Sequence, residues 1–238
     1  MSTFRASAAG GNNTPNTAAT ATLTSVVGDL WVAFGLTVNQ GASGFTDNQG
    51  GTWTLIRDAV FPGSGGGRVT AWVRNQLFTT AVSTTVTLTP TIPNTGIEVV
   101  VVAISGAFIA GISAILQSAE TNNGVAGVAT VTLPAAANAD NEVIVALGDR
   151  VNPPGLTAPS GFSNLQNVGQ STPIGLIVAN RNSGFTGTAI TWSTNPGTDW
   201  AGIAFELSPG IASNGPSLPG STPGSIGGPS LGSNSAFA

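Results

Sequence analysis

The side chains that could carry acid–base chemistry in this chain are almost all carboxylates. The sequence contains no histidine, cysteine, lysine or tyrosine. That composition excludes Ser-His-Asp and Cys-His catalysis, and it excludes a lysine nucleophile. A zinc or copper site would have to be built from oxygen ligands alone, which those metals rarely accept in proteins. We therefore expect no metal and no cofactor.

A pair of carboxylates in a cleft would be enough for a glycoside hydrolase. Nine of the ten acids are candidates for such a pair, namely Asp29, Asp47, Asp58, Glu98, Asp140, Glu142, Asp149, Asp199 and Glu206. Asp29 and either Asp140 or Asn141 fall at the same turn of an internal repeat, and Glu98 begins a predicted strand. Such positions are typical of turn caps and strand edges. We therefore predict no catalytic residue and expect that the protein is not an enzyme.

Two glycine-rich segments and two arginines are further candidates for ligand-binding sites. DNQGG at residues 47–51 could hold calcium through oxygen ligands, but it lacks dense acidic spacing and fits a hairpin turn better. GSGGGR at residues 63–68 lacks the lysine of a phosphate loop, which favours a mobile loop. Arg74 and Arg181 end matching strands, where salt bridges or hydrogen bonds to loop carbonyls account for them.

Alternating apolar residues predict a chain made of strands. The clearest is GDLWVAFGL at residues 28–36, where every second side chain is strongly apolar. The other strands predicted in the first half cover residues 20–24, 68–75, 83–89 and 97–105, with a hairpin over residues 45–56. Residues 1–16 could be an arm or an edge strand, and residues 106–127 could contain a short helix or form a packed loop.

The second half repeats the first in the same order. TVTLP, DNEVIVAL, SGFSNL, IGLIVANRN, TAITWS and WAGIAFELS match TATLT, GDLWVAF, GTWTLI, GRVTAWVRN, TTVTLT and IEVVVVAIS. We predict an all-β fold: a single jelly-roll-like β-sandwich built from two pseudo-repeated halves, about residues 20–105 and 128–208, that close one core between them. Residues 1–19 form an N-terminal arm in this scheme, and five tryptophans on or beside strands contribute to the core.

The charge of the chain is low and scattered. Charged residues make up 7% of the sequence, and the net charge is −4. No basic stripe could follow a phosphate backbone, so we expect no nucleic-acid partner. The longest apolar run, residues 99–104, is too short to span a bilayer, and residues 1–16 lack the apolar region of a signal peptide. We expect synthesis in a host cytoplasm and no membrane partner.

The composition changes after Pro209. Residues 210–238 are rich in Pro, Gly and Ser and carry no charge. Alone, such a segment cannot bury enough apolar surface to offset its ordering entropy. We expect this C-terminal arm, residues 209–238, to gain structure against neighbouring subunits. Its predicted partner-binding residues are Ile211, Leu218, Ile226, Leu231 and Phe237.

Several segments of the chain carry a resemblance to a known group of proteins. GDLWVAF, TDNQGGTWTLIR, GRVTAWVRN, STTVTLT and IEVVVVAISG resemble a pattern in phage-encoded and bacterial β-rich proteins, whose recurring forms are GDLLVA and TDNQGNTWTL. The resemblance covers residues 20–208 and specifies turns and core strands. It implies a jelly-roll or similar sandwich of the kind found in virion surface proteins and adhesin-like modules. It supplies no catalytic residue.

These observations lead to one expected function and two alternatives. The expected function is a structural protein of a tailed-phage virion: a head decoration, cement or minor capsid protein. It would be oligomeric, for example a trimer, and would dock on other virion proteins through its terminal arm. The first alternative is a carbohydrate- or receptor-binding module of a tail fibre that uses exposed Trp53, Trp72 or Phe162 as stacking platforms. The second is a glycoside hydrolase.

Overall fold

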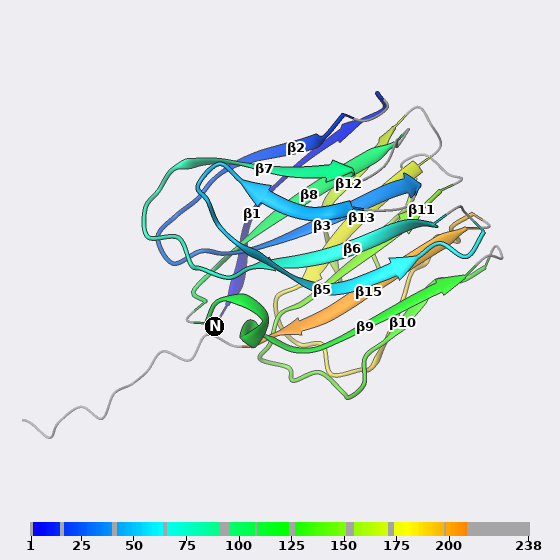
Figure 1. Cartoon of the computed structure of the whole chain (residues 1–238). Helices are drawn as coiled ribbons and strands as arrows, with labels where there is room; N and C mark the ends of the chain where they lie inside the picture. Colours follow the sequence, from blue (N-terminus) through cyan, green and yellow to red (C-terminus); the bar gives the residue numbers. More distant parts are fainter. Residues whose placement is uncertain are drawn as a thin grey trace, which may run out of the picture.

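The protein is built almost entirely from β-strands (Figure 1). The computed structural model describes residues 2–14, 17–39, 42–63, 66–90, 96–107, 109–123, 127–150, 155–170, 174–197 and 199–208. In these residues the only helix is a single 3₁₀ turn, η1 (Gly111–Ala114). The strands form two five-stranded sheets, one three-stranded sheet and one two-stranded sheet, with antiparallel pairing throughout. The predicted all-β sandwich class is confirmed.

The first half of the chain forms a five-stranded sheet and a three-stranded sheet. Its strands are β1 (Thr3–Asn12), β2 (Ala19–Thr24), β3 (Leu30–Asn39), β4 (Ala42–Asp47), β5 (Trp53–Val60), β6 (Gly66–Arg74), β7 (Ser83–Pro90) and β8 (Ile97–Ser105). The large sheet has the order β1-β8-β3-β6-β5, and the small sheet has the order β2-β7-β4. The pairs β1–β8, β2–β7 and β3–β6 are nested in sequence.

The second half of the chain uses the same plan. Its strands are β9 (Ile115–Asn123), β10 (Thr130–Thr132), β11 (Val143–Asp149), β12 (Ser163–Gln170), β13 (Ile174–Arg181), β14 (Ala189–Thr191) and β15 (Trp200–Leu207). The large sheet has the order β12-β13-β11-β15-β9, and β10 pairs with β14. Read from β9, this is the order of the first half. No strand corresponds to β4 among the described residues that join β11 to β12.

The two large sheets also share their irregularities. In the first half, bulges leave Arg5 of β1 and Ile56 of β5 without a residue opposite them. In the second half, Leu116 of β9 and Leu165 of β12 are the extra residues at the corresponding places. A bulge is a specific local feature of a strand pair. Its recurrence at both places supports the repeat that the sequence indicates.

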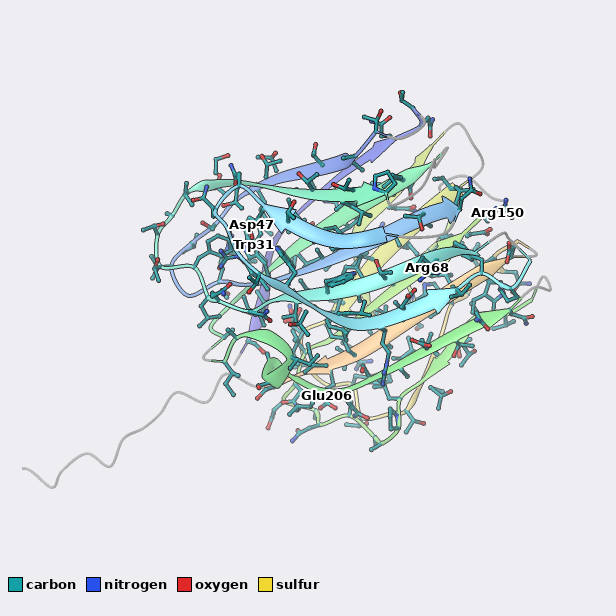
Figure 2. All side chains as sticks on the ribbon, in the orientation of Figure 1. Trp31, Asp47, Arg68, Arg150 and Glu206 are labelled. Atoms are coloured by element: carbon teal, nitrogen blue, oxygen red, sulfur yellow. The ribbon has the colours of Figure 1, made fainter. Side chains whose placement is uncertain are left out.

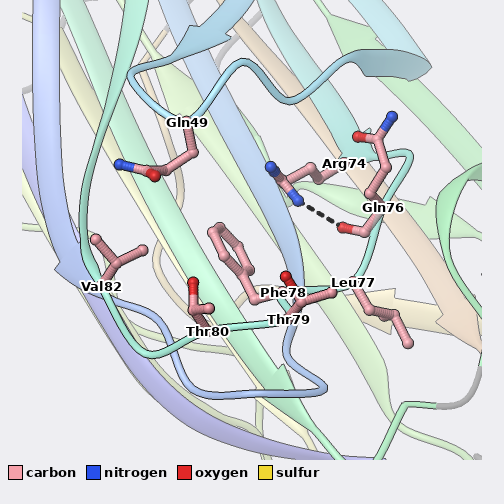
Figure 3. Close-up of a pocket in the computed structure, with 8 residues that line it drawn as sticks. All are labelled: Gln49, Arg74, Gln76, Leu77, Phe78, Thr79, Thr80 and Val82. Atoms are coloured by element: carbon pink, nitrogen blue, oxygen red, sulfur yellow. Dashed lines mark hydrogen bonds between the residues drawn. The ribbon is translucent and has the colours of Figure 1, made fainter.

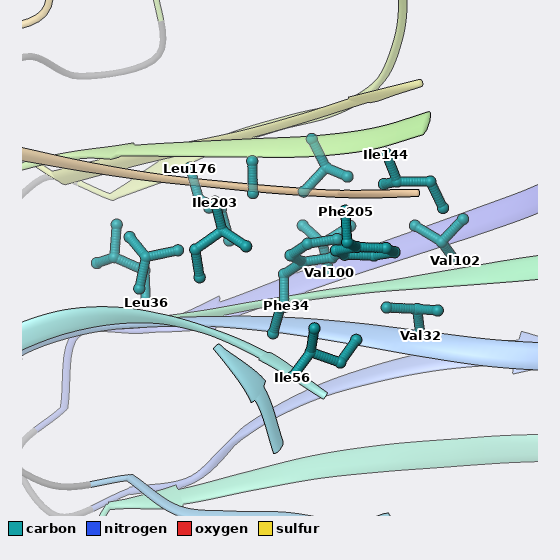
Figure 4. Packing of buried hydrophobic residues seen from close by; sticks show 14 of the residues in the cluster. Val32, Phe34, Leu36, Ile56, Val100, Val102, Ile144, Leu176, Ile203 and Phe205 are labelled. Carbon is teal, nitrogen blue, oxygen red and sulfur yellow. The ribbon is translucent and has the colours of Figure 1, made fainter. Parts of the chain in front are cut away.

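The apolar side chains gather in three layers between four stacked sheets. The predicted core between the halves is present: inward side chains of β3 and β8 meet those of β11, β13 and β15 (Figure 4). Phe34 stacks on Phe205 there, with ring centroids 5.8 Å apart. A further core lies inside each half, between its large and its small sheet. Trp31 belongs to the core of the first half and Trp192 to that of the second.

The open edges of the two large sheets meet each other, and side chains join them. On one side, Gln166 Nε2 of β12 donates to Ser7 Oγ of β1 at 2.9 Å. On the opposite side, Arg57 Nη2 of β5 donates to the carbonyl oxygen of Ser118 in β9 at 2.8 Å. Ser7 and Ser118 occupy matching positions of the repeat, as do Gln166 and Arg57. The halves are therefore related by an approximate two-fold arrangement.

Three details differ from the sequence-based expectations. The predicted hairpin over residues 45–56 is wrong, because β4 pairs with β7 of the small sheet while β5 pairs with β6 of the large one. Residues 3–12 form an edge strand, one of the two alternatives considered, and so belong to the sandwich and not to a separate arm. The segment after residue 106 holds η1 and then strand β9, which the sequence did not predict.

Candidate functional site

A polar cavity lies at one end of the first half, between the turn after β4 and the loop after β6 (Figure 3). Its volume is about 320 Å³. It is lined by Gln49, Arg74, Gln76, Leu77, Phe78, Thr79, Thr80 and Val82. No carboxylate is among these lining residues. The cavity therefore has amides, hydroxyls and one guanidinium group, but no acid–base pair for hydrolysis.

Arg74 is the charged group of this cavity, and its contacts hold it firmly. Its Nε donates to Asp47 Oδ2 at 3.0 Å, and its Nη1 donates to the carbonyl oxygen of Gln76 at 2.8 Å. Its Cζ lies 4.2 Å from the centroid of the Phe78 ring, within the range of a cation–π contact. The side chains of Arg74 and Asp47 are only 7% and 0% exposed. The cavity is therefore close to neutral despite its arginine.

The side chain of Asp47 stabilises the turn between β4 and β5 by accepting hydrogen bonds from it. Its Oδ1 accepts the backbone N–H groups of Gln49 and Gly51, each at 2.9 Å, and its Oδ2 also accepts Trp53 Nε1 at 3.1 Å. Burial alone would raise the pKa of Asp47, but the bonds from Gly51 and Arg74 outweigh it and hold that pKa below 3.8. Because donors already surround both oxygens, the turn explanation of DNQGG fits better than calcium. The described residues contain no cluster of acids suited to a metal ion.

The second half has a related but simpler corner. Arg181 donates to the carbonyl oxygens of Ser183 and Gly184, at 3.2 and 2.8 Å, and its Cζ lies 6.0 Å from the Phe185 ring. The spacing Arg-Asn-x-x-Phe is thus common to both halves, and the predicted bonds of Arg74 and Arg181 to loop carbonyls are confirmed. Arg181 has no carboxylate partner among the described residues. The counterpart of Asp47 would belong to a strand equivalent to β4, and the described residues between β11 and β12 contain no such strand.

Most of the remaining acids have structural partners of their own, and Figure 2 shows that Asp47 and Glu206, for example, lie far apart in the molecule. Asp29 pairs with Arg5, Asp58 with Arg68 and Asp199 with Arg150; Asp149 accepts the N–H of Gly197, and Glu206 accepts Asn141, Gln117 and the N–H of Asn138. Asp140 is exposed at a turn, and Asn141 matches Asp29 in the repeat. The sequence predicted a turn position for Asp29 and for Asp140 or Asn141.

Two buried carboxyls point into the core between the halves. Burial raises the pKa of Glu98 to about 9, against a smaller lowering by the N–H of Leu176. Burial likewise raises the pKa of Glu142 to about 7, opposed by the hydrogen bond that Asn180 Nδ2 donates at 2.7 Å. Both side chains are fully buried. Each therefore favours its neutral form, and neither lines the cavity.

None of the aromatic residues considered as stacking platforms is exposed. Trp53 and Trp72 are half-buried against Phe45, with ring centroids 5.9 and 6.3 Å away. Phe162 is half-buried against Phe185, with centroids 5.6 Å apart. Each ring is partly covered by a neighbouring ring, so the expectation of a fully exposed platform at these positions is wrong.

Other sequence-based expectations fall partly outside the described residues. The predicted partner-binding residues Ile211, Leu218, Ile226, Leu231 and Phe237 all lie there. In the glycine-rich segment, Gly63 donates to Asp199 Oδ1 at 3.0 Å, and residues 66–68 already belong to β6. The part of the chain that the structure describes contains no helix long and apolar enough to cross a membrane.

Sequence reasoning did not find the cavity itself. Its polar lining comes from Gln49, Gln76, Thr79 and Thr80, which no short motif connects. The one available signal was Arg74 followed by an aromatic residue four positions later. Comparison with known proteins gives no further assignment: no family model matches the chain, and no match was found among curated proteins or solved structures.

Proposed function

We propose that this protein is a non-enzymatic structural component of a phage particle, a head decoration, cement or minor capsid protein. It docks on the major capsid protein or on neighbouring copies of itself. The C-terminal arm, residues 209–238, makes part of that contact. The assignment to a phage particle is a hypothesis drawn from the sequence resemblance. The role as a structural subunit that packs against neighbours is supported by the distribution of charge.

The observation that carries the proposal is that the charged groups are used inside the molecule. All six arginines are paired with groups of this chain: four form ion pairs with carboxylates, Arg57 donates to the carbonyl oxygen of Ser118, and Arg181 donates to those of Ser183 and Gly184. Burying an unpaired charge in a contact costs far more free energy than burying an apolar group or a hydroxyl that finds a hydrogen-bond partner. A surface with so few free charges suits a protein that packs against neighbours.

Cryo-electron microscopy of purified particles tests this proposal. We expect density that fits the four-layer sandwich at repeated positions of the head lattice, with added density for residues 209–238 along an adjoining subunit. Particles that contain the chain only in the tail, or not at all, would contradict the assignment to the head. Sedimentation of the isolated protein would give the oligomeric state separately.

The polar cavity favours a second candidate function, a carbohydrate- or receptor-binding module of a tail fibre. Amide and hydroxyl groups beside an apolar wall are the usual lining of a small-ligand site. A glycan array tests it: binding that is lost in Gln49→Ala but kept in Thr191→Ala, a change at an exposed position of β14 in the small sheet of the second half, would support this function. Absence of binding across the array would leave the cavity without that role.

A further inference from the structure

The chain leaves the sandwich beside η1. Ser208 is the last described residue, and its N–H donates to the carbonyl oxygen of Ala114 at 2.8 Å. Its own carbonyl oxygen accepts Ser2 Oγ at 3.2 Å. These two bonds fix the start of residues 209–238 at the end of the molecule where η1 and the N-terminus lie (Figure 1).

Exposed apolar side chains flank this exit point. Ile109, Ile112 and Leu116 are 39%, 48% and 53% exposed, and they lie on either side of Ala114 within eight consecutive positions. We call these three side chains the η1 patch. The described chain exposes few other large apolar side chains, namely Val26, Val27, Leu55, Val60 and Val128. The patch is thus a local concentration of apolar surface.

The two halves differ at this place: the second half has an apolar side chain where the first half has a charged one. Leu116 is the bulge residue of β9, and Arg5 is the bulge residue of β1. Arg5 binds Asp29 in the first half, while Asn141 takes the place of Asp29 in the second. The second half therefore has a leucine where the first has an ion pair. This is the half from which the chain exits.

The segment that follows has the composition to cover such a patch. Residues 209–238 contain no charged residue, and their first two large apolar residues are Ile211 and Leu218. Ile211 is three positions beyond Ser208, so an extended chain of about 10 Å carries it across η1. Closing so short a loop costs little entropy. Burial of the patch would remove its apolar area from water, which favours the contact.

We propose that Ile211 and Leu218 of the same chain cover the η1 patch. This contact fixes the direction in which the rest of the arm leaves the sandwich. Leu231 and Phe237 then remain free for neighbouring subunits. The inference concerns the isolated chain and does not depend on the particle in which the protein works.

Hydrogen–deuterium exchange of the full-length protein tests the contact. In the double variant Ile211→Ser, Leu218→Ser we expect exchange in peptides from residues 109–116 to rise several-fold. The matched control Phe237→Ser should leave exchange there unchanged. Because the contact lies within one chain, protection of the patch should not depend on protein concentration. The thermal unfolding midpoint checks that each variant keeps the sandwich.

A second variant tests the contact from the patch side. Leu116→Arg restores the residue type of the first half and should raise exchange in peptides from residues 209–222. Equal exchange in wild-type and variant proteins would overturn the proposal. Protection that rises with concentration would overturn it in favour of a second copy on the patch. Protection in the isolated protein, together with absence of the chain from head lattices, would retain this inference and reject the particle assignment.

Discussion

Arg74 illustrates how the protein keeps a charge inside an apolar corner. Its guanidinium has a carboxylate, a carbonyl oxygen and an aromatic face as partners, so its charge is compensated within the protein. A buried ion pair contributes little to stability compared with an apolar pair of the same size. Loss of one partner is a different matter, because the remaining charge stays buried and uncompensated.

Asp47→Asn should therefore destabilise the protein by about 3–5 kcal/mol, since it leaves the buried Arg74 without its counter-charge. Urea unfolding at pH 7 measures the change. The matched control is Asp58→Asn, which removes the partner of Arg68 in a pair whose side chains are 24% and 30% exposed. We expect about 0–1 kcal/mol there. Equal effects of the two changes would show that burial of the Asp47 pair has no energetic weight.

Glu98 should make the free energy of unfolding decrease as the pH rises. Its pKa is about 4.5 in the unfolded chain and about 9 in the folded state, so the folded state retains a proton that the unfolded chain has released. The stability conferred by the neutral carboxyl is complete below pH 4.5 and is lost as the pH rises towards 9. The free energy of unfolding should fall by up to about 1.4 kcal/mol per pH unit in this range.

Glu98→Gln should flatten that slope, because glutamine is neutral at every pH. Glu142→Gln should act likewise but only up to about pH 7, the pKa of Glu142 in the folded state. Urea titrations between pH 5 and 9 measure both slopes. Glu120→Gln is the control, since the side chain of Glu120 is exposed. A slope that survives both changes in the core would assign the pH dependence to other groups.

At the scale of single residues, the sequence predicted short-range hydrogen bonds better than it predicted the cavity. The bonds of Arg74 and Arg181 to loop carbonyls follow from their place at strand ends, a few residues from their partners. The pairing of Asp47 with Arg74 joins strands of two different sheets, and no local pattern encodes that. The cavity depends on the same long-range arrangement. Its polar lining was therefore not predictable from the composition of any one segment.

At the scale of elements, the two large sheets fit because corresponding positions differ in size. Leu36 of β3 and Gly148 of β11 occupy matching places, since their cross-strand neighbours also match. A Cβ added to Gly148 would lie 2.3 Å from Val69 Cγ2 and 2.8 Å from Leu36 Cδ1. The absence of a side chain at Gly148 thus makes room for the side chain of its own counterpart.

Gly148→Ala should destabilise the protein by about 1–3 kcal/mol through overpacking of the central core. Leu36→Ala alone should cost about 2–5 kcal/mol because it leaves a cavity. The double variant should cost less than the sum of the two, since the smaller residue at 36 removes one of the two close contacts of the methyl group at 148 and leaves space into which Val69 can shift. Denaturant unfolding of the four proteins measures the coupling. Strict additivity would mean that the two positions do not compete for space.

The strands with strong alternation or continuous apolar runs were all predicted, among them β3, β6, β8, β13 and β15. Strand β9 was missed because it is a half-exposed edge strand, and the sequence ILQSAETNN has only weak alternation. The hairpin over β4 and β5 was wrong for another reason. Turn chemistry shows where a chain reverses, but the sheet that the next strand joins is decided by packing. The structure places β4 over the outer face of the large sheet.

At the scale of the whole molecule, the two halves share their largest core and join at both sheet edges. We expect a single cooperative unfolding transition, because neither half can unfold without exposing the inner face of the other. Calorimetry measures this through agreement of the calorimetric and van't Hoff enthalpies. Two separate transitions, or exchange in β11 at lower denaturant than in β3, would instead show independent domains.

Because Leu36 of the first half corresponds to Gly148 of the second, the inner face of each half fits the other half better than it fits a copy of itself. If two copies of the first half associated in the observed geometry, leucine would meet leucine and the sheets would be forced apart. Two copies of the second half would place glycine opposite glycine and leave a void. Only the unlike combination fills the space, so a half released by proteolysis has no well-fitting homotypic mate.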